Sequence, residues 1–503
     1  MGSSSTAAQG LYTAAGVREL DRRAIEDHAI DGYALMERAG AAAFRLLCLR
    51  WPGARRVAVY CGGGNNGGDG LVVARLARAA GLSVRVVLTV EAERLKGAAR
   101  RAWDDFVAAG GSAEAPQALD PAWADVAVDA LLGTGIDRPV RGAIATAIQQ
   151  LHEAGRPVLA LDIPSGLQAD TGAVMGAAVR AAATITFIGA KRGLYTGDAP
   201  DYTGPIFLNR LDVPASIYRG EDRPVRPIEG HWVARELPRL RPCAHKGERG
   251  RILVIGGDHG FPGAPRLAAE ASLRAGAGLV AVVTRSDHVT AVTSARPELM
   301  VRSLEAPEQA LGAHLGGIDS VIAGPGLGRG QWGREVLAAL AEYRPQGLVL
   351  DADGLNLLAE GVAPDLRPAV ITPHPGEAAR LLASTVAAVQ SDRFRALEQL
   401  VERYACTVVL KGPGTLVAGP DSDPALCPGA RPGLAIGGSG DVLAGLIGAL
   451  LGRGMEPGPA ARAAVWLHAH AGRDAHWQVG SGALPGDFAA LAARWLAESG
   501  ANG

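Results

Sequence analysis

Residues 56–70 read Arg-Val-Ala-Val-Tyr-Cys-Gly-Gly-Gly-Asn-Asn-Gly-Gly-Asp-Gly, and this stretch decides the fold of the first half of the chain. It predicts a buried strand over Arg56–Cys61, a glycine-rich turn, and a helix over Leu71–Ala80. Such a turn is where doubly wound α/β sheets bind nucleotides. It is not the G-x-G-x-x-G fingerprint, and its paired asparagines suit a cation or a ribose–phosphate. A purely structural turn, in which asparagine tolerates the left-handed conformation, is the alternative.

Short apolar strands and amphipathic helices alternate outward from this stretch, which predicts a parallel sheet covered on both faces. The expected helices are Glu91–Ala109 and Ala143–Ala154. The other expected strands are Ser83–Thr89, Ala124–Ala130 and Pro157–Asp162, with Thr184–Ile188 and Pro205–Leu208 as candidates to extend the sheet.

A proline-rich segment, Asp212–Arg241, interrupts the alternation and is interpreted as a linker or domain edge. The alternation then restarts, so we expect two tandem α/β domains, over residues 11–218 and 225–498. Expected strands of the second domain are Ile252–Ile255, Leu279–Val283, Ser320–Ala323, Gly347–Leu350, Ala369–Ile371 and Val408–Leu410. Expected helices are Ala264–Ala275, Arg334–Tyr343, Arg393–Tyr404, Asp441–Leu451 and Pro459–Trp477.

The composition is that of a globular enzyme without a strongly charged partner. A chain of 503 residues is too long to form a single hydrophobic core. The formal net charge of −1 implies no general attraction to nucleic acid or anionic membranes. The five cysteines form no C-x-x-C pair, which fits a reducing cytoplasm and argues against disulfides or zinc. Residues 1–10 lack an apolar signal-peptide region and are interpreted as a disordered start or residues added for expression. No apolar run is long enough to span a membrane.

Polar residues follow neighbouring strands in the first half. Asp129 and Asp162 end two strands, and the carboxyl ends of parallel strands share one crevice, where Ser165 and Asn66 can join them. Oxygen ligands without histidine or thiolate favour a hard cation. The loop 133–141 adds two arginines that can hold a phosphate.

In the second half, residues 436–447 combine a glycine-rich turn with one aspartate and an apolar helix. Bare N–H groups at a helix N-terminus bind phosphate, and Asp441 beside that anion can take a proton from an attacking hydroxyl. A tight loop with Asp441 as the helix N-cap is the structural alternative. Lys411 can meet phosphate as a point charge, and His374 can orient a substrate, although a surface histidine is the simpler interpretation.

The first-half motifs Gly62–Gly70, Val128–Gly135 and Leu161–Gly166 together resemble the YjeF N-terminal family, the NAD(P)H-hydrate epimerases. The resemblance spans most of residues 11–215. It implies a Rossmann-like fold, a potassium ion on Asn66, Asp129 and Ser165, and Asp162 as the candidate acid/base. The residues it implies to touch substrate are Asn65, Asn66, Gly67, Gly68, Asp69, Gly133, Thr134, Gly135, Ile136, Asp137, Arg138, Pro139 and Asp162.

The second-half motifs Gly324–Gly328, Thr372–Glu377, Lys411–Thr415 and Gly437–Asp441 resemble the YjeF C-terminal family. These are ADP- or ATP-dependent NAD(P)H-hydrate dehydratases of ribokinase-like fold, and the resemblance covers about residues 231–495. It implies hydrate contacts from Ala264, Gly326, His374 and Asp441, with magnesium at the nucleotide phosphates. The nucleotide-binding residues are Lys411, Gly412, Pro413, Gly414 and Thr415, together with Gly437, Gly438, Ser439 and Gly440 of the anion turn. Pro413 stands where alanine is commoner in the family and offers no N–H.

The two resemblances together imply a bifunctional repair enzyme for hydrated NADH (NADHX) and hydrated NADPH (NADPHX). The first domain would interconvert the R- and S-hydrates, and the second would dehydrate the S-hydrate through phosphorylation and phosphate elimination. We also expect a cytoplasmic homo-oligomer that binds neither nucleic acid nor membranes. The alternatives are a ribokinase-like small-molecule kinase with an N-terminal nucleotide-binding domain, and a nucleotide-sensing protein with a degenerate site.

Overall fold

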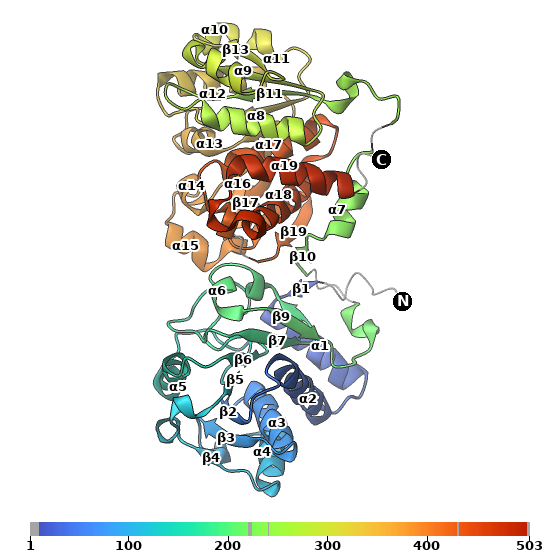
Figure 1. The fold of residues 1–503 in the computed structure, drawn as a ribbon, viewed down its shortest axis with the longest axis vertical. Helices are drawn as coiled ribbons and strands as arrows, with labels where there is room; N and C mark the ends of the chain where they lie inside the picture. The colour runs from blue at the N-terminus through green and yellow to red at the C-terminus, as the bar shows by residue number, and fades with distance from the viewer. Residues whose placement is uncertain (1–9, 220–223, 240, 430–431, 500–503) are drawn as a thin grey trace. The chain divides into compact units, whose positions relative to one another are not determined.

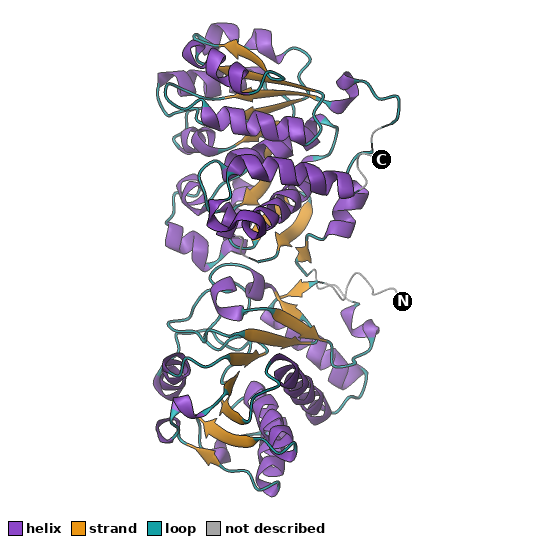
Figure 2. Cartoon of the chain, in the orientation of Figure 1, coloured by secondary structure: helices purple, strands orange, loops and turns teal. Residues whose placement is uncertain are grey.

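The computed structural model describes residues 10–219, 224–239, 241–429 and 432–499. The chain divides into two compact units, Met1–Val225 and Arg226–Gly503. Each unit is a sheet of mostly parallel strands with helices packed on its faces (Figures 1 and 2).

The first unit has a seven-stranded, fully parallel sheet of order β4-β3-β2-β5-β6-β7-β9. The chain runs from β2 to one side of the sheet and returns to β5 on the other, so the topological switch lies between β2 and β5. The first six of these strands have the Rossmann order, as expected. The strands are β2 (Arg56–Cys61), β3 (Ser83–Leu88), β4 (Ala113–Glu114), β5 (Val126–Ala130), β6 (Val158–Leu161), β7 (Ala183–Phe187) and β9 (Ile206–Asn209), with β1 (Leu11–Tyr12) and β8 (Ala190–Lys191) paired separately.

The alternation of side chains along β2 explains why both faces of this sheet are covered. Val57 and Val59 belong to the large core beneath α1, α2, α3 and α4, whereas Ala58 and Tyr60 belong to a second core beneath α5. The helices are α1 (Ala14–Arg22), α2 (Gly32–Arg50), α3 (Asn65–Ala79), α4 (Gly97–Ala108), α5 (Gly142–Glu153) and α6 (Pro200–Thr203).

The second unit has a ten-stranded sheet of order β10-β19-β18-β17-β16-β15-β14-β11-β12-β13, whose switch lies between β11 and β14. Its strands are parallel except where β18 pairs with β17 and β19. They are β10 (Arg226–Pro227), β11 (Arg251–Ile255), β12 (Leu279–Thr284), β13 (Met300–Ser303), β14 (Ser320–Ala323), β15 (Leu348–Leu350), β16 (Val370–Ile371), β17 (Thr407–Leu410), β18 (Thr415–Gly419) and β19 (Ser422–Cys427).

Small residues let the central helices α8 and α17 of this unit pack closely. A Cβ atom on Gly445 would lie 2.2 Å from the Ala268 carbonyl oxygen, and the Ser272 hydroxyl donates to the Gly445 carbonyl at 2.9 Å. The helices are α7 (Gly230–Glu236), α8 (Gly263–Arg274), α9 (Val289–Ala295), α10 (Pro307–Ala310), α11 (Gly312–Leu315), α12 (Gln331–Tyr343), α13 (Ala352–Ala359), α14 (Pro375–Leu381), α15 (Val386–Ser391), α16 (Arg393–Tyr404), α17 (Ser439–Gly452), α18 (Pro457–Val479) and α19 (Pro485–Glu498).

Several expected boundaries are wrong. The helix expected over Leu71–Ala80 begins at Asn65, so most of the glycine-rich turn forms its first two turns. The helix expected from Glu91 begins at Gly97. The segment interpreted as a linker contains β10 and α7, because β10 pairs with β19 and α7 packs against α18. Residues 1–9, interpreted as a disordered start or expression remnant, lie outside the described residues.

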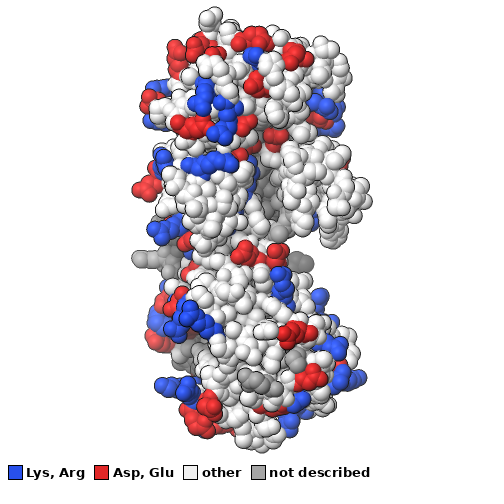
Figure 3. All heavy atoms as spheres, turned by 90° about the vertical axis from the view of Figure 1, so that its left-hand side faces the viewer, with Lys and Arg blue, Asp and Glu red and all other residues white. Residues whose placement is uncertain are grey.

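On the face shown in Figure 3, basic and acidic side chains are mixed among the described residues. No described helix has the length and apolar character needed to cross a bilayer.

We predict that fragments 1–225 and 226–503 each unfold cooperatively, because each has its own core. Fragment 1–218 should melt at a lower temperature than 1–225. It lacks Val225, whose N–H and carbonyl exchange two hydrogen bonds of 2.9 Å with Leu11. Each bond contributes about 1 kcal/mol, and about 2–4 °C of melting temperature accompanies each kcal/mol in a domain of this size. Calorimetric melting of the three fragments checks this, and equal melting of 1–218 and 1–225 would contradict it.

Candidate active sites

The polar residues expected at strand ends of the first unit meet at its topological switch. Asn66 lies in the first turn of α3, directly after β2, while Asp129 lies in β5 and Asp162 follows β6. Neighbouring strands β2, β5 and β6 therefore bring the three side chains to one edge of the sheet.

Asp129 and Ser165 form a closed hydrogen-bonded pair in the interior. Both are fully buried, and Ser165 donates to the two Asp129 carboxylate oxygens, from its hydroxyl at 2.6 Å and its N–H at 2.8 Å. Burial raises the pKa of Asp129 to about 6, although these hydrogen bonds and one from the Leu131 N–H oppose the shift. A cation beside the pair would favour the ionised carboxylate.

The Asn66 side chain leaves one oxygen without a partner. Its amide nitrogen donates to the carbonyls of Leu132, at 2.9 Å, and Leu161, at 3.1 Å. Because both partners are acceptors, the amide orientation is fixed, and Oδ1 is buried with no hydrogen-bond partner. Leu132 also contacts the Ser165 hydroxyl, so Asn66 and Ser165 share a neighbour.

Asp162 is held in an unusual conformation beside a buried ammonium. Its φ of +66° is sparsely populated by residues other than glycine. Lys191, at the end of β8, donates from Nζ to Asp162 Oδ1. Asp162 Oδ2 lies 3.5 Å from the position that a Cβ atom would take on Gly133, so this oxygen faces the 133–139 loop.

Two further carboxyl groups interact with this ion pair. Asp21, on α1, has its pKa raised to about 6, mainly by burial, against the opposing charge of Lys191. Burial raises the pKa of Asp69 well above its ordinary value, and the charges of Asp162 and Asp21 add to that shift.

The remaining candidates of this unit divide into packed and exposed positions. Gly67 and Gly68 are packing glycines, because a Cβ atom would lie 2.0 Å from the Gly62 carbonyl oxygen or 2.6 Å from the Met36 side chain. Asn65 is exposed. In the loop, Ile136 is buried, Gly133 and Thr134 are half-buried, and Gly135, Asp137, Arg138 and Pro139 are exposed.

In the second unit, Lys411 follows β17 and lies among carboxylates. Its Nζ lies 2.7 Å from Asp351 Oδ1 and 3.8 Å from Glu377 Oε2. Burial lowers the pKa of Lys411, but the two carboxylates outweigh this effect and leave the pKa raised. Burial raises the pKa of Glu377, and the charge of Asp351 adds to the shift against that of Lys411. A Cβ atom on Gly440 would lie 3.2 Å from Lys411 Nζ, so the expected anion turn adjoins the lysine.

Asp441 is the third residue of α17, whose N-cap is Gly438 at φ +92°. The alternative of Asp441 as an N-cap is therefore wrong. Burial and the charge of Asp351 raise the pKa of Asp441 to about 7, while Lys411 opposes the shift. A carboxyl group with that pKa is suited to act as a general base near neutral pH.

A buried histidine contacts the glycine-rich turn before Asp441. The Ser439 hydroxyl lies 3.2 Å from Nε2 of His468, on α18. Burial lowers the pKa of His468 to about 4, so its imidazole is neutral at physiological pH. Gly438 packs against α8, since a Cβ atom there would lie 2.7 Å from Leu267.

His374 and the glycine loop of β14 also lie near this cluster. Nδ1 of His374 accepts from the N–H of Gly376 at 3.0 Å and caps α14, and the Glu377 carboxylate accepts from the His374 N–H in return. Burial and the charge of Lys411 lower the pKa of His374. A Cβ atom on Gly326, at φ +58°, would lie 3.3 Å from the Ala264 side chain, so these two candidates are neighbours.

The lysine motif has a support that was not expected from the sequence. Arg393, on α16, is fully buried and donates to the carbonyls of Leu410 and Lys411 at 3.1 and 3.2 Å. A Cβ atom on Gly412, at φ +134°, would lie 2.9 Å from its guanidinium. Further along the motif, the Thr415 hydroxyl donates to the Gly412 carbonyl at 3.0 Å, while Pro413 is half-buried and Gly414 buried.

Two family models match the chain. One, described as YjeF-related protein N-terminus, matches residues 32–193, and the other, described as NAD(P)H-hydrate dehydratase, matches residues 252–492. The bifunctional NAD(P)H-hydrate repair enzyme Nnr of Coxiella burnetii is 45% identical over 467 residues, covering 92% of this chain and 94% of that protein. The chain belongs to the family of bifunctional NAD(P)H-hydrate repair enzymes.

Other relatives agree with this assignment. The Nnr enzyme of Escherichia coli K12 is 43% identical and covers 91% of this chain and 88% of its own length. A ribokinase-like superfamily protein of Enterococcus faecalis is 24% identical with a TM-score of 0.50, covering 55% of this chain and 96% of its own. This last similarity supports the ribokinase-like fold alone.

Four residues of these two clusters were not expected from the sequence. They are Asp21, Lys191, Arg393 and His468, each of which contacts or faces a predicted residue from a distant element. Asp351 was not singled out either, and Glu377 was named only as the end of the Thr372–Glu377 motif. Burial of a charged residue is the signal that separates them from surface charges, and a single sequence does not display it.

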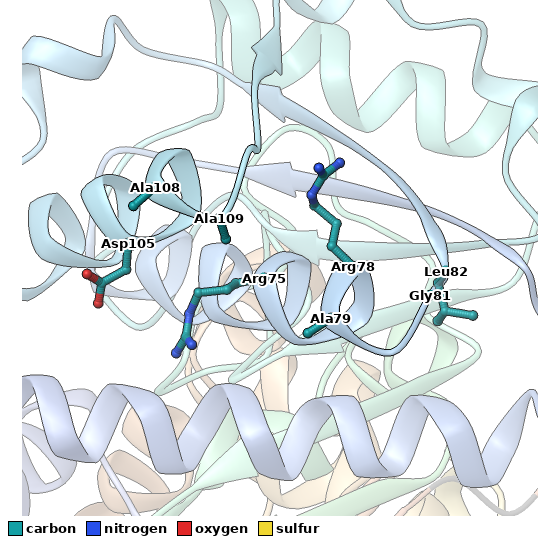
Figure 4. A pocket seen from close by; sticks show the side chains of 8 residues that line it. All are labelled: Arg75, Arg78, Ala79, Gly81, Leu82, Asp105, Ala108 and Ala109. Carbon is teal, nitrogen blue, oxygen red and sulfur yellow. The ribbon is translucent and has the colours of Figure 1, made fainter.

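The pocket in Figure 4 lies elsewhere, between the C-terminal parts of α3 and α4, with a volume of about 760 Å³. Arg75 and Arg78 point away from one another there, and they bind Glu37 and the Gly110 carbonyl respectively. No predicted site residue lines it. The lining residues are Arg75, Arg78, Ala79, Gly81, Leu82, Asp105, Ala108 and Ala109.

We predict that Gly440→Ala impairs dehydration far more than Gly437→Ala. The new methyl group at 440 would crowd the Lys411 ammonium at 3.2 Å and would also contact Asp351 at 3.5 Å, whereas at 437 it would meet nothing within 4 Å. Misplacing a binding group by about 1 Å can cost roughly 100-fold in rate. Steady-state kinetics of both variants with hydrated NADH and nucleotide check this. Equal losses would show that proximity to Lys411 is unimportant.

Proposed function

We propose that the two activities of this family are divided between the two units. The first unit would interconvert the R- and S-hydrates of NADH and NADPH at Asp162. The second would use ADP or ATP to dehydrate the S-hydrate at Asp441. The observation that carries this division is that each unit has its own lysine–aspartate ion pair, with the aspartate directly after a parallel strand. The candidate acid/base carboxyl belongs to this pair in the first unit and lies close to it in the second.

Epimerisation follows from the chemistry of a hydrated ring. Water adds to the enamine double bond of reduced nicotinamide at the carbon next to the ring nitrogen. A carboxyl group that protonates this hydroxyl lets the nitrogen lone pair expel it as water, which leaves an iminium ion. Water then returns to the opposite face and gives its proton back to the carboxylate. Asp162 is the proposed acid/base, through the Oδ2 oxygen that faces the 133–139 loop.

Dehydration uses the same hydroxyl differently. Asp441 would take its proton while the hydroxyl oxygen attacks the terminal phosphorus of the nucleotide, and the shortened nucleotide would leave. The resulting phosphate ester is a good leaving group, so the nitrogen lone pair expels phosphate. Loss of a proton from the adjacent carbon then restores the double bond. The N–H groups of the Gly437–Gly440 turn and the Lys411 ammonium would stabilise charge on the transferring phosphate.

The residues present fit a potassium ion in the first unit. The unpartnered oxygen of Asn66, the buried Asp129 carboxylate and the Ser165 hydroxyl are hard oxygen ligands. Bound there, potassium would supply a positive charge that helps to fix these residues beside the substrate.

Magnesium fits the second unit as a companion of the nucleotide. The described residues contain no group of three or more acidic, histidine or cysteine side chains arranged to hold a metal alone. Magnesium commonly binds through substrate phosphates with only one or two carboxylates. Asp351 and Glu377 are the nearby candidates. The ion would neutralise phosphate charge.

Turnover of the purified chain with hydrated NADH and hydrated NADPH, each with ADP or ATP, tests the proposal. Repair restores the absorbance band of reduced nicotinamide, and the comparison decides the co-substrate. A small-molecule kinase would consume nucleotide without restoring the band, and a sensor would do neither. That the protein is a cytoplasmic homo-oligomer and binds neither nucleic acid nor membranes stays a prediction.

We predict that Asp441→Asn lowers dehydration by about 10²–10⁴-fold, the usual cost of losing a general base. Because the pKa of Asp441 is raised to about 7, its base form is lost as the pH falls through 7 and is complete above that value. Dehydration by the unmodified chain should therefore decline on the acid side of pH 7. Rate measurements between pH 5.5 and 9 check both points. Near-normal turnover of the variant would remove Asp441 from this role.

We predict that Asp129→Ala abolishes stabilisation by potassium. A ligand at ten times its Kd stabilises a protein by about 1.4 kcal/mol, so potassium should raise the melting temperature of the unmodified first unit. Exchange for tetramethylammonium, which is much larger than potassium, should reverse this effect and slow epimerisation. The variant should be indifferent to the exchange. Indifference of the unmodified chain would refute the cation site.

A further inference from the structure

The side chain of Lys191 has no exposed surface, yet all three of its ammonium hydrogens have acceptors. Nζ donates to Asp162 Oδ1, to the Thr186 hydroxyl at 2.9 Å and to the Phe187 carbonyl at 3.3 Å. Two of these acceptors belong to β7. A buried cation with every donor engaged has a single available position.

The consequence falls on Asp162. Lys191 occupies one carboxylate oxygen, Oδ1, and leaves Oδ2 as the oxygen next to Gly133. The Asp162 backbone is left-handed at φ +66°, a conformation that costs energy for a residue other than glycine. A strong local interaction is needed to keep this side chain in one orientation, and the Lys191 ammonium supplies it.

We propose that Lys191 is a positioning residue of the epimerase, which holds Oδ1 of Asp162 and thereby aims Oδ2 at the hydrate. The inference rests on the proposed role of Asp162 as the acid/base. It assigns Lys191 no proton transfer, because all three of its hydrogens face protein acceptors.

The Lys191 ammonium is surrounded by several carboxyl groups. Its charge acts on the carboxyl groups of Asp21, on α1, and Asp69, on α3, as well as on Asp162. Asp162 is the one of these three that binds Nζ directly. If Lys191 were only structural, its loss would lower the stability of the unit without a specific effect on epimerisation through Asp162.

A double-mutant cycle in the full chain separates these two roles. The variants are Lys191→Met, Asp162→Asn and the two together, and epimerisation is measured from the R-hydrate. We expect Lys191→Met to lower kcat by about 10²–10⁴-fold, as for loss of the acid/base itself, with a much smaller change in KM. The double variant should be no slower than Asp162→Asn, because Lys191 acts through Asp162. Dehydration of the S-hydrate by the second unit serves as an internal control in every variant.

A matched pair of threonines keeps the inference testable if Lys191→Met fails to fold. Thr184 and Thr186 are fully buried, two residues apart on β7 and hence on one face of the sheet. Thr186 accepts from Lys191, whereas Thr184 donates to the Thr203 carbonyl at 2.7 Å. Both valine variants should lose melting temperature similarly, but only Thr186→Val should slow epimerisation, by about 10-fold.

The outcomes are distinguishable. If Asp162→Asn epimerises normally, the proposed function of Asp162 fails. If Asp162→Asn is inactive but Lys191→Met is active, only the role of Lys191 fails. Additive losses in the double variant, or equal kcat for Thr184→Val and Thr186→Val, would likewise overturn the positioning role. A non-additive cycle with a selective loss in Thr186→Val supports it.

Discussion

Both sites depend on a lysine that is paired with an aspartate at a strand end. Lys191 binds Asp162 in the first unit, and Lys411 binds Asp351 in the second. Burying either charge alone would cost several kcal/mol, so each pair persists only because both partners and their hydrogen bonds are in place. The sheets supply that placement, since parallel strands deliver their carboxyl ends to one edge. The pair in the second unit then acts on Asp441, the proposed general base.

The two pairs are used in different ways. In the first unit the paired carboxylate, Asp162, is itself the proposed acid/base, and the lysine fixes its direction. In the second unit the paired carboxylate, Asp351, is distinct from the base. Asp351 helps to raise the pKa of Asp441 to about 7, and Lys411 partly opposes it. A phosphate arriving at the Gly437–Gly440 turn would meet this lysine, and its charge would be shared among the turn, the ammonium and a nucleotide-bound cation.

Local patterns were sufficient for the regular elements but not for irregular ones. The expected strands Arg56–Cys61 and Ser320–Ala323 and the helix Arg393–Tyr404 match residue for residue, because apolar periodicity and flanking polar residues mark both ends. The start of α3 was misplaced because glycines disfavour helices locally, whereas packing against Gly62 and Met36 requires them here. The antiparallel strands β18 and β19 were not recognised, since proline and aspartate interrupt the second one.

The site residues likewise divide into those that belong to local motifs and those that depend on distant partners. Residues in glycine-rich strand-end motifs were predictable, because the motif itself carries the geometry. Lys191 and His468 were not, because their roles arise from partners 29 residues away in each case, at Asp162 and Ser439. These side chains acquire their roles because they are buried next to those partners. Their burial depends on how the sheet and helices assemble.

A glycine lies beside each of the two ion pairs. A Cβ atom on Gly133 would lie 3.5 Å from Asp162 Oδ2, and one on Gly440 would lie 3.2 Å from Lys411 Nζ. Neither glycine has a positive φ, so backbone conformation does not require it at either position. The absence of a side chain instead leaves the charged groups open on one side, while protein covers the others. A ring hydroxyl or a phosphate can therefore reach a charge that water reaches poorly, and that combination strengthens electrostatic catalysis in a buried site.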